Sequence, residues 1–348
     1  MADIPIIDIS EANRHAARQL LEAATDNGFV FIKPNNTTGI SASEIDDMFD
    51  LSKAFFACPT AVKSECAINS AASGKNRGWL GMHGETLDPA KQKRGDFKEA
   101  FNFSSLDPPQ PLSGALAPSR QQLLAFQSKC HALCLRILRL FGVALGTDPL
   151  DWFVERHDAT SGTTGSVLRM LYYPGLPEDV GKLDEVDIRA GAHSDYGSVT
   201  LLFQRRGQPG LEIWSRNQRW ESVPVDPTGD TPAGDALPIL VNIGDVLSYW
   251  TNGLLKSTVH RVIFPKTDGK PADHKELDRY SMVYFCHPLD DAELVSVPSK
   301  IVESLGGSED AKKEMQKVKG LSGAGKVMTA QDHLNARLGA TYDLKLKA

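Results

Sequence analysis

The segment VLRMLYY, residues 167–173, is the first of seven short apolar segments that fill the second half of the chain. Each segment is four to seven residues long, and glycine, proline and aspartate lie between them. The other six cover residues 199–203, 211–214, 239–243, 246–249, 258–264 and 280–286. Short strands at regular spacing, with turn signals between them, are typical of an all-β sandwich or barrel. The sequence therefore predicts a mainly β core over residues 160–300.

Residues 1–150 have a different, mostly helical texture. Short strands are expected at 4–9 and 29–32, and helices at 11–27, from the capping box Ser41-Ala42-Ser43-Glu44 to about residue 57, and at 119–146. Cys130 and Cys134, one turn apart in the longest helix, are interpreted as core packing. Residues 69–118 are rich in glycine and proline and predict loops. With a C-terminal helical part at 301–348, the prediction is a single α+β domain spanning 1–348.

Composition limits the partners of the chain. Its 348 residues carry 38 Lys and Arg against 44 Asp and Glu, a net charge of −6, so nucleic acid is disfavoured as a partner. No apolar run reaches the roughly 18 residues of a membrane span, and the first residues do not resemble a secretory signal. The five cysteines contain no Cys-x-x-Cys pair and predict free thiols in a reducing compartment, the cytoplasm.

Three pairs of histidine and acidic residues compete as a metal site. His83 and Glu85 lie in the loop-rich region without a partner histidine on a neighbouring predicted strand. His157 and Asp158 are adjacent, so on a strand their side chains would point to opposite faces. Both pairs are weak candidates.

His193-Ser194-Asp195 is the strongest candidate. Residues two apart on a strand point to the same face, so the imidazole and the carboxylate can bind one cation. His260 lies in another strand-like segment, 257–262. Two histidines and one carboxylate leave three positions open on an octahedral metal, which suits Fe(II) with a co-substrate and O₂. Zinc is the competing metal, since the same ligands also serve hydrolases.

Arg279 and Ser281 share a face of the next predicted strand. A guanidinium and a hydroxyl form a good receiver for a carboxylate, because the guanidinium can bind both oxygens. Arg279 begins a segment that is otherwise apolar enough to be buried, and a buried arginine needs an anion.

With these residues the sequence resembles the Fe(II)- and 2-oxoglutarate-dependent dioxygenases of the isopenicillin N synthase-like family. The resemblance covers nearly the whole chain, and the order and spacing of its segments make it specific. The segments are IPIID (4–8), GFVF (28–31), DFKEAF (96–101), LRMLYYP (168–174), HSDYG (193–197), NIGD (242–245), HRV (260–262) and RYS (279–281). The resemblance implies a double-stranded β-helix, or jelly roll, with flanking helices and with iron at its mouth.

The resemblance also implies roles for single residues. His193, Asp195 and His260 would bind iron, while Arg279, Ser281 and Tyr173 would hold 2-oxoglutarate. Leu171 stands where plant relatives often have asparagine, so the surroundings of the co-substrate are expected to differ there. The substrate is expected to contact Phe285 and a lid within residues 69–103, which includes Arg77, Trp79, Phe97 and Phe101.

The implied reaction is oxidation of a small organic molecule, by hydroxylation, desaturation or ring formation, as O₂ converts 2-oxoglutarate to succinate and CO₂. Three alternatives remain open at this point. They are a 2-oxoglutarate-independent iron oxidase on the same scaffold, a zinc-dependent hydrolase, and a binding protein without activity. A monomer or weak homodimer is expected, and the sequence does not identify the substrate.

Overall fold

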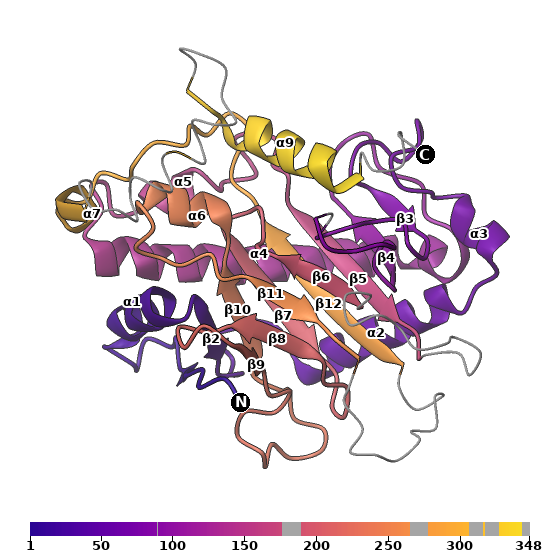
Figure 1. Ribbon diagram of the computed structural model, residues 1–348, viewed down its shortest axis with the longest axis horizontal. Coiled ribbons are helices and arrows are strands. Elements are labelled where there is room, and N and C mark those ends of the chain that lie inside the picture. The colour runs from indigo at the N-terminus through magenta and orange to yellow at the C-terminus, as the bar shows by residue number, and fades with distance from the viewer. Residues whose placement is uncertain (89, 176–188, 265–277, 306–315, 317–326, 343–348) are drawn as a thin grey trace.

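The computed structural model describes residues 1–88, 90–175, 189–264, 278–305, 316 and 327–342. Two β-sheets form its centre (Figure 1). The larger sheet has eight strands in the order β1-β2-β10-β7-β12-β5-β4-β3, and the smaller has four in the order β6-β11-β8-β9. The strands are β1 (Ile6–Ile7), β2 (Phe29–Ile32), β3 (Gly78–Leu80), β4 (Glu99–Phe103), β5 (Val167–Tyr173), β6 (Ala190–His193), β7 (Val199–Gln204), β8 (Leu211–Trp214), β9 (Trp220–Ser222), β10 (Ile239–Ile243), β11 (His260–Val262) and β12 (Arg279–Cys286).

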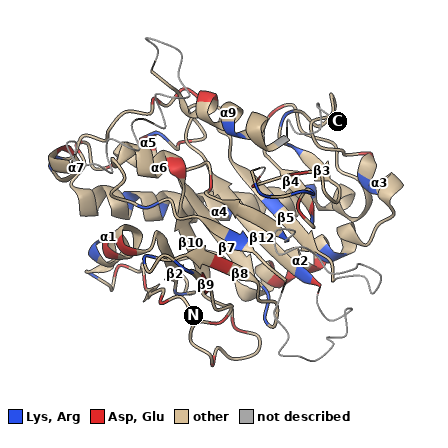
Figure 2. Ribbon diagram, in the orientation of Figure 1, with Lys and Arg blue, Asp and Glu red and all other residues tan. Residues whose placement is uncertain are grey.

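Helices cover the outer face of the larger sheet, and the long α4 crosses behind it in Figure 1. The helices are α1 (Ala16–Asp26), α2 (Ala42–Phe56), α3 (Thr60–Ser64), α4 (Arg120–Leu145), α5 (Trp152–Glu155), α6 (Asp245–Trp250), α7 (Lys300–Leu305) and α9 (Ala330–Tyr342), with a 3₁₀ turn at Gly114–Ser119. Most charged residues lie on helices and loops, whereas the central strands carry few (Figure 2).

Strand alternation divides the larger sheet into two faces. On β12, Met282, Tyr284 and Cys286 pack into the core under the helices, whereas Val283 and Phe285 face the smaller sheet. A second apolar cluster joins residues of both sheets, including Leu202 and Val262. The two sheets therefore face each other with side chains between them, which is the jelly roll that the sequence resemblance implied.

Local signals explain where the helices begin and end. Ser41 and Glu44 form the expected capping box before α2, with the Ser41 hydroxyl accepting from the Glu44 amide. Gly146, in the left-handed conformation at φ +59°, ends α4. Cys130 and Cys134 are fully buried in α4, as expected for core packing.

Three predictions of local structure were wrong. Residues 246–249 belong to α6, not to a strand, because Gly244 caps a helix whose first residue is Asp245. The loop-rich region 69–118 contains β3 and β4, which extend the larger sheet. The segment 258–264 is a strand only at His260–Val262. The predicted C-terminal helical part is observed as α7 and α9, and residues 306–315, 317–326 and 343–348 lie outside the described residues.

Candidate metal and co-substrate site

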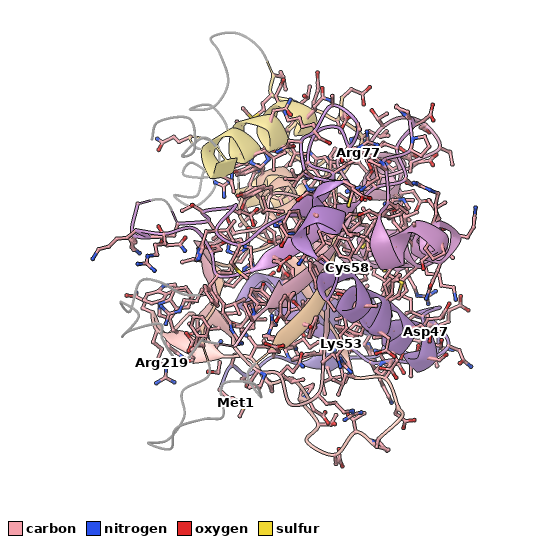
Figure 3. All side chains as sticks on the ribbon, turned by 90° about the vertical axis from the view of Figure 1, so that its right-hand side faces the viewer. Met1, Asp47, Lys53, Cys58, Arg77 and Arg219 are labelled. Carbon is pink, nitrogen blue, oxygen red and sulfur yellow. The ribbon has the colours of Figure 1, made fainter. Side chains whose placement is uncertain are left out.

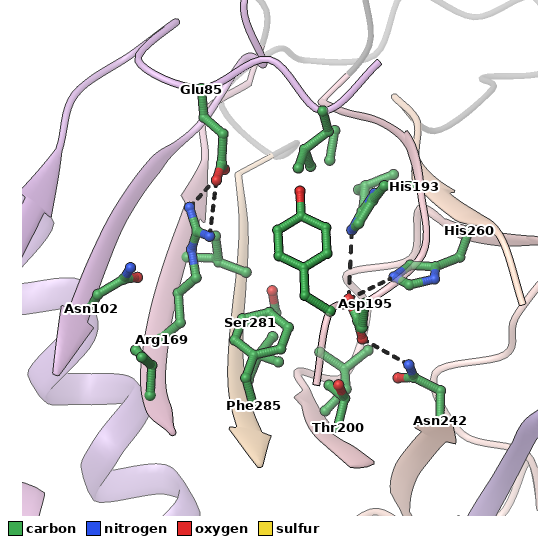
Figure 4. A pocket seen from close by; sticks show the side chains of 18 of the residues that line it. Glu85, Asn102, Arg169, His193, Asp195, Thr200, Asn242, His260, Ser281 and Phe285 are labelled. Atoms are coloured by element: carbon green, nitrogen blue, oxygen red, sulfur yellow. Dashed lines mark hydrogen bonds and ion pairs between the residues drawn. The ribbon is translucent and has the colours of Figure 1, made fainter. Parts of the chain in front are cut away.

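His193, Asp195 and His260 converge between the two sheets (Figure 4). One ligand atom from each lies within 4.8 Å of the others. The Asp195 Oδ1 atom is 3.8 Å from His193 Nε2 and 3.6 Å from His260 Nε2. These side chains are mostly buried, and the described residues contain no other such group. The donor set fits a divalent transition metal bound on one face.

Hydrogen bonds prepare both histidines to act as ligands. His193 Nδ1 lies 2.7 Å from the Gly191 carbonyl, and His260 Nδ1 lies 3.1 Å from the Thr258 carbonyl. A carbonyl only accepts, so each Nδ1 carries the proton and each Nε2 presents a lone pair toward Asp195. Burial lowers the pKa of His193 to about 3, so the neutral form that a metal needs is present at neutral pH.

Asp195 lies beyond the end of β6, not on the strand with His193 as the spacing predicted. The start of α6 holds this loop instead. The amides of Gly244, Asp245 and Val246 donate to the carbonyls of Ser198, Asp195 and Gly197, at 2.8–3.0 Å. A Cβ at position 244 would lie 2.2 Å from the Gly197 carbonyl oxygen, so only glycine allows this approach.

Asn242 and Thr200 hold the Asp195 carboxylate. Asn242 Nδ2 donates to Asp195 Oδ2 at 2.7 Å, while Oδ1 faces the histidines. Burial opposes ionisation of Asp195, but the hydrogen bonds that its carboxylate accepts from Asn242 and Thr200 help to keep its pKa below the ordinary value. The carboxylate therefore remains charged and oriented.

Substituting Asn242 by leucine should weaken iron binding by about 10- to 100-fold, because an outer partner of a ligating carboxylate is removed. Fe(II) titration under anaerobic conditions measures this effect. An unchanged affinity would show that Asn242 does not orient Asp195, and Asn36→Leu, in the loop after β2 and outside the cavity lining, serves as the control.

Arg279 is 1 % exposed and shares a cavity with the three candidate ligands. Its Nη1 donates to Ser281 Oγ at 3.2 Å, its Nε donates to the Gln208 carbonyl at 3.3 Å, and its guanidinium lies 5.1 Å from the Tyr173 ring. Among the described residues it forms no ion pair with a carboxylate. A buried guanidinium at a cavity wall fits a carboxylate ligand.

The cavity has a volume of about 110 Å³ and is lined by strands of both sheets. Tyr173, Ser281 and Phe285 line it, as the sequence suggested. Leu171, the position that differs from plant relatives, also lines it. The space is several times what one water molecule needs by this measure.

The predicted lid residues lie elsewhere. Arg77, on the side of the molecule that carries α2 and α3 (Figure 3), donates to the carbonyls of Leu106 and Pro108. Trp79 Nε1 donates to Glu99, and Phe101 is fully buried against Phe55 in the core under the helices. Phe97 packs against His83 and Phe264 outside the cavity lining. None of these four residues lines this cavity, so their contact with substrate stays a prediction.

The sequence analysis missed other residues of the cavity wall. They are Glu85, Lys98, Asn102 and Arg169, together with Leu334 and Leu338 of α9. One signal was available, because Arg169 is a single charged residue inside an apolar strand, and Arg279 is a charged residue at the start of one. Glu85 was considered only as a metal ligand beside His83, yet it pairs with Arg169 and Lys98, and His83 Nδ1 contacts the Gly95 carbonyl.

The other weak candidate pair, His157 and Asp158, also has a structural explanation. His157 is fully buried, with Nδ1 at 2.6 Å from the Phe153 carbonyl and Nε2 at 2.8 Å from Ser198 Oγ. Both ring nitrogens are satisfied within the protein, so this histidine is a packing residue.

Comparison with known proteins gives a consistent result. Residues 164–288 match the 2OG-Fe(II) oxygenase superfamily, and residues 4–122 match the N-terminal region described as non-haem dioxygenase in morphine synthesis. The chain is 31 % identical over 285 residues to the 2-oxoglutarate-dependent dioxygenase htyE of Aspergillus rugulosus, which covers 77 % of this chain and 80 % of that protein. It is 38 % identical over 267 residues to the UPF0676 protein C1494.01 of Schizosaccharomyces pombe, which covers 75 % and 76 %.

A solved structure extends the similarity to the whole fold. A full-length Neurospora crassa protein, crystallised with α-ketoglutarate and thymine, superposes with a TM-score of 0.74 at 27 % identity, over 97 % of this chain and 96 % of that chain. α-Ketoglutarate is another name for 2-oxoglutarate. None of the helices in the described residues has the length and apolar character to cross a membrane. The chain belongs to the 2OG-Fe(II) oxygenase superfamily, and it is an Fe(II)- and 2-oxoglutarate-dependent dioxygenase that oxidises a small molecule with O₂.

Proposed function

We propose that His193, Asp195 and His260 hold the iron, and that Arg279 and Ser281 bind the distal carboxylate of 2-oxoglutarate beside Tyr173. The observation that carries this assignment is the shared cavity, which brings three convergent metal ligands and a buried guanidinium together. When bound, iron supplies the activation of O₂ that couples decarboxylation of 2-oxoglutarate to oxidation of a C–H bond.

The chain itself supplies orientation and a dry site. The two histidines offer neutral Nε2 atoms, and Asn242 fixes the angle of the Asp195 carboxylate. Arg279 points a fixed positive charge into the cavity, and Ser281 Oγ lies within 3.2 Å of that charge. Leu171, Val283 and Phe285 add apolar side chains to the cavity lining, which would help to displace water once the ligands are bound.

The assignment is tested by following succinate formation from 2-oxoglutarate with purified protein. We expect production that requires both Fe(II) and O₂ and that zinc does not support. Thymine, the ligand crystallised with the Neurospora crassa protein, is a useful first substrate to add. Turnover supported by zinc in the absence of O₂ would favour the hydrolase alternative, and an oxidised product without succinate would favour the 2-oxoglutarate-independent oxidase.

The organisation of the chain is also part of the proposal. We propose one catalytic domain over residues 1–348, because β1 and β2 from the N-terminal part pair within the same sheet as β10. We propose a monomer or weak homodimer in the cytoplasm, and the free thiols, such as the fully buried Cys134 and Cys286, favour this reducing compartment.

A further inference from the structure

Opposite the metal ligands, the cavity has a wall of polar residues that the assignments above do not use. We call Glu85, Lys98, Asn102 and Arg169 the polar wall. Figure 4 shows Glu85, Asn102 and Arg169 on the side of the cavity away from the metal ligands. Asn102 on β4 and Arg169 on β5 are direct partners in the antiparallel register, so both side chains lie on the same face of the sheet. Val283 on β12 is the next residue in that row. The polar wall is thus built on rigid strands.

The polar wall and its supporting Asp96 contain balanced charges. Arg169 donates to both oxygens of Glu85, at 3.2 and 2.7 Å. Lys98 Nζ lies 2.8 Å from Glu85 and 2.6 Å from Asp96. Burial opposes ionisation of Glu85 and Lys98, but the opposite charges around them lower the pKa of Glu85 and raise the pKa of Lys98. Glu85 and Lys98 are therefore kept in their charged forms, and the formal charges of Arg169 and Lys98 match those of Glu85 and Asp96.

The co-substrate side of the cavity is balanced as well under the proposed assignment. The dianion 2-oxoglutarate would face Arg279, while the divalent iron faces Asp195, so these four charges cancel. An anionic or cationic substrate would leave one charge uncompensated among buried side chains, which is unfavourable. Charge balance thus points to a substrate without net charge.

Asn102 adds a directional requirement. Its Nδ2 donates to the backbone carbonyl of Asn76 at 3.1 Å and to Asn76 Oδ1 at 2.9 Å. The backbone carbonyl can only accept, so the orientation of the Asn102 amide is fixed. Its Oδ1 is buried and has no hydrogen-bond partner within the described residues, while the residue is only 1 % exposed and lines the cavity. An unsatisfied buried acceptor at a cavity wall calls for a ligand donor.

The remaining surface is apolar. Phe285 lies between the polar wall and the metal ligands (Figure 4), and Leu334 and Leu338 of α9 also line the cavity. A Cβ at Gly165 would lie 2.4 Å from a Leu334 methyl carbon, so α9 packs closely over this end of the cavity. This contact limits the size of a ligand.

We propose that the primary substrate is a compact molecule without net charge that donates an N–H or O–H hydrogen bond to Asn102 and places an apolar flank against Phe285 and α9. This inference rests on the proposed function, because it places iron and 2-oxoglutarate in the other half of the cavity.

The test uses the anaerobic complex of the full chain with Fe(II) and 2-oxoglutarate, whose visible charge-transfer band responds to a bound substrate. The probes are five- and six-membered lactams and cyclic imides, their N-methyl derivatives, and ring-matched carboxylates and ammonium compounds. We expect the N–H compounds to perturb the band at concentrations about tenfold or more below those of the other classes.

Two variants test the residues. Asn102→Leu should remove the preference for N–H over N-methyl compounds, while the 2-oxoglutarate titration changes by less than about twofold. The control Asn36→Leu, in the loop after β2 and outside the cavity lining, should behave as wild type. Glu85→Gln leaves the polar wall with a positive excess and should improve carboxylate binding by about tenfold.

If a variant fails to fold, the measurements on the wild-type protein are enough to test the proposal. Carboxylates or ammonium compounds that act at lower concentrations than the N–H compounds would contradict the charge argument. Equal responses to N–H and N-methyl compounds, or none to either, would contradict the role of Asn102. Failure to form the band with Fe(II) and 2-oxoglutarate would instead contradict the proposed function.

Discussion

Replacing Asp195 by alanine is expected to reduce Fe(II)-dependent succinate formation to below about 1 % of the wild-type rate. The variant loses the one anionic ligand, so two neutral imidazoles would have to hold a divalent cation in a buried site. Asn242, whose Nδ2 donates to Asp195, would also lose its acceptor. Iron content after anaerobic loading measures the loss of metal binding, and the rate of succinate formation measures the loss of activity.

The exposed Asp291→Ala variant is the matched control, since it removes an aspartate that does not line the cavity. It should retain wild-type iron content and rate. A folded Asp195→Ala protein that binds iron and produces succinate normally would remove Asp195 from the ligand set.

Replacing Arg279 by alanine is expected to raise the KM for 2-oxoglutarate by about 100-fold or more, with a smaller effect on iron binding. The side chain is buried and its charge has no carboxylate partner among the described residues. In the variant, the carboxylate of the co-substrate loses both the positive charge of the guanidinium and its paired N–H donors. Arg279→Lys keeps the charge alone and should fall between the wild type and the alanine variant.

Initial rates at varied 2-oxoglutarate concentration, with Fe(II) saturating, measure this effect. Arg18, exposed on α1, provides an Arg→Ala control that should leave the KM unchanged. An unaltered KM in a folded Arg279→Ala protein would assign the guanidinium to another ligand.

The β core was predictable where strands are both apolar and regular. Residues 167–173, 211–214 and 239–243 form strands with the predicted bounds. The period-two rule also placed Arg279 and Ser281 on one face, and both line the cavity. Asp195 reached the predicted position for a different reason, since the start of α6 holds its loop beyond the end of β6. That contact joins segments about 50 residues apart, so no local sequence pattern predicts it.

The substrate side was less predictable because its residues depend on long-range pairing. The aromatic residues at 79, 97 and 101 were expected to contact substrate, but β3 and β4 join the edge of the larger sheet and direct Phe101 into the core. The same pairing turns Asn102 toward the cavity beside Arg169. A polar residue in an otherwise apolar segment was the available signal. It was used to predict a ligand-binding role for Arg279 but not for Asn102 or Arg169.

A crystal structure of the protein grown anaerobically with Fe(II) and 2-oxoglutarate, with data collected at the iron absorption edge, tests the central assignment most directly. The account predicts one anomalous peak bonded to His193 Nε2, Asp195 Oδ1 and His260 Nε2, and a keto-diacid whose far carboxylate contacts Arg279 and Ser281. Iron bound by other residues, or 2-oxoglutarate with no contact to Arg279, would contradict it.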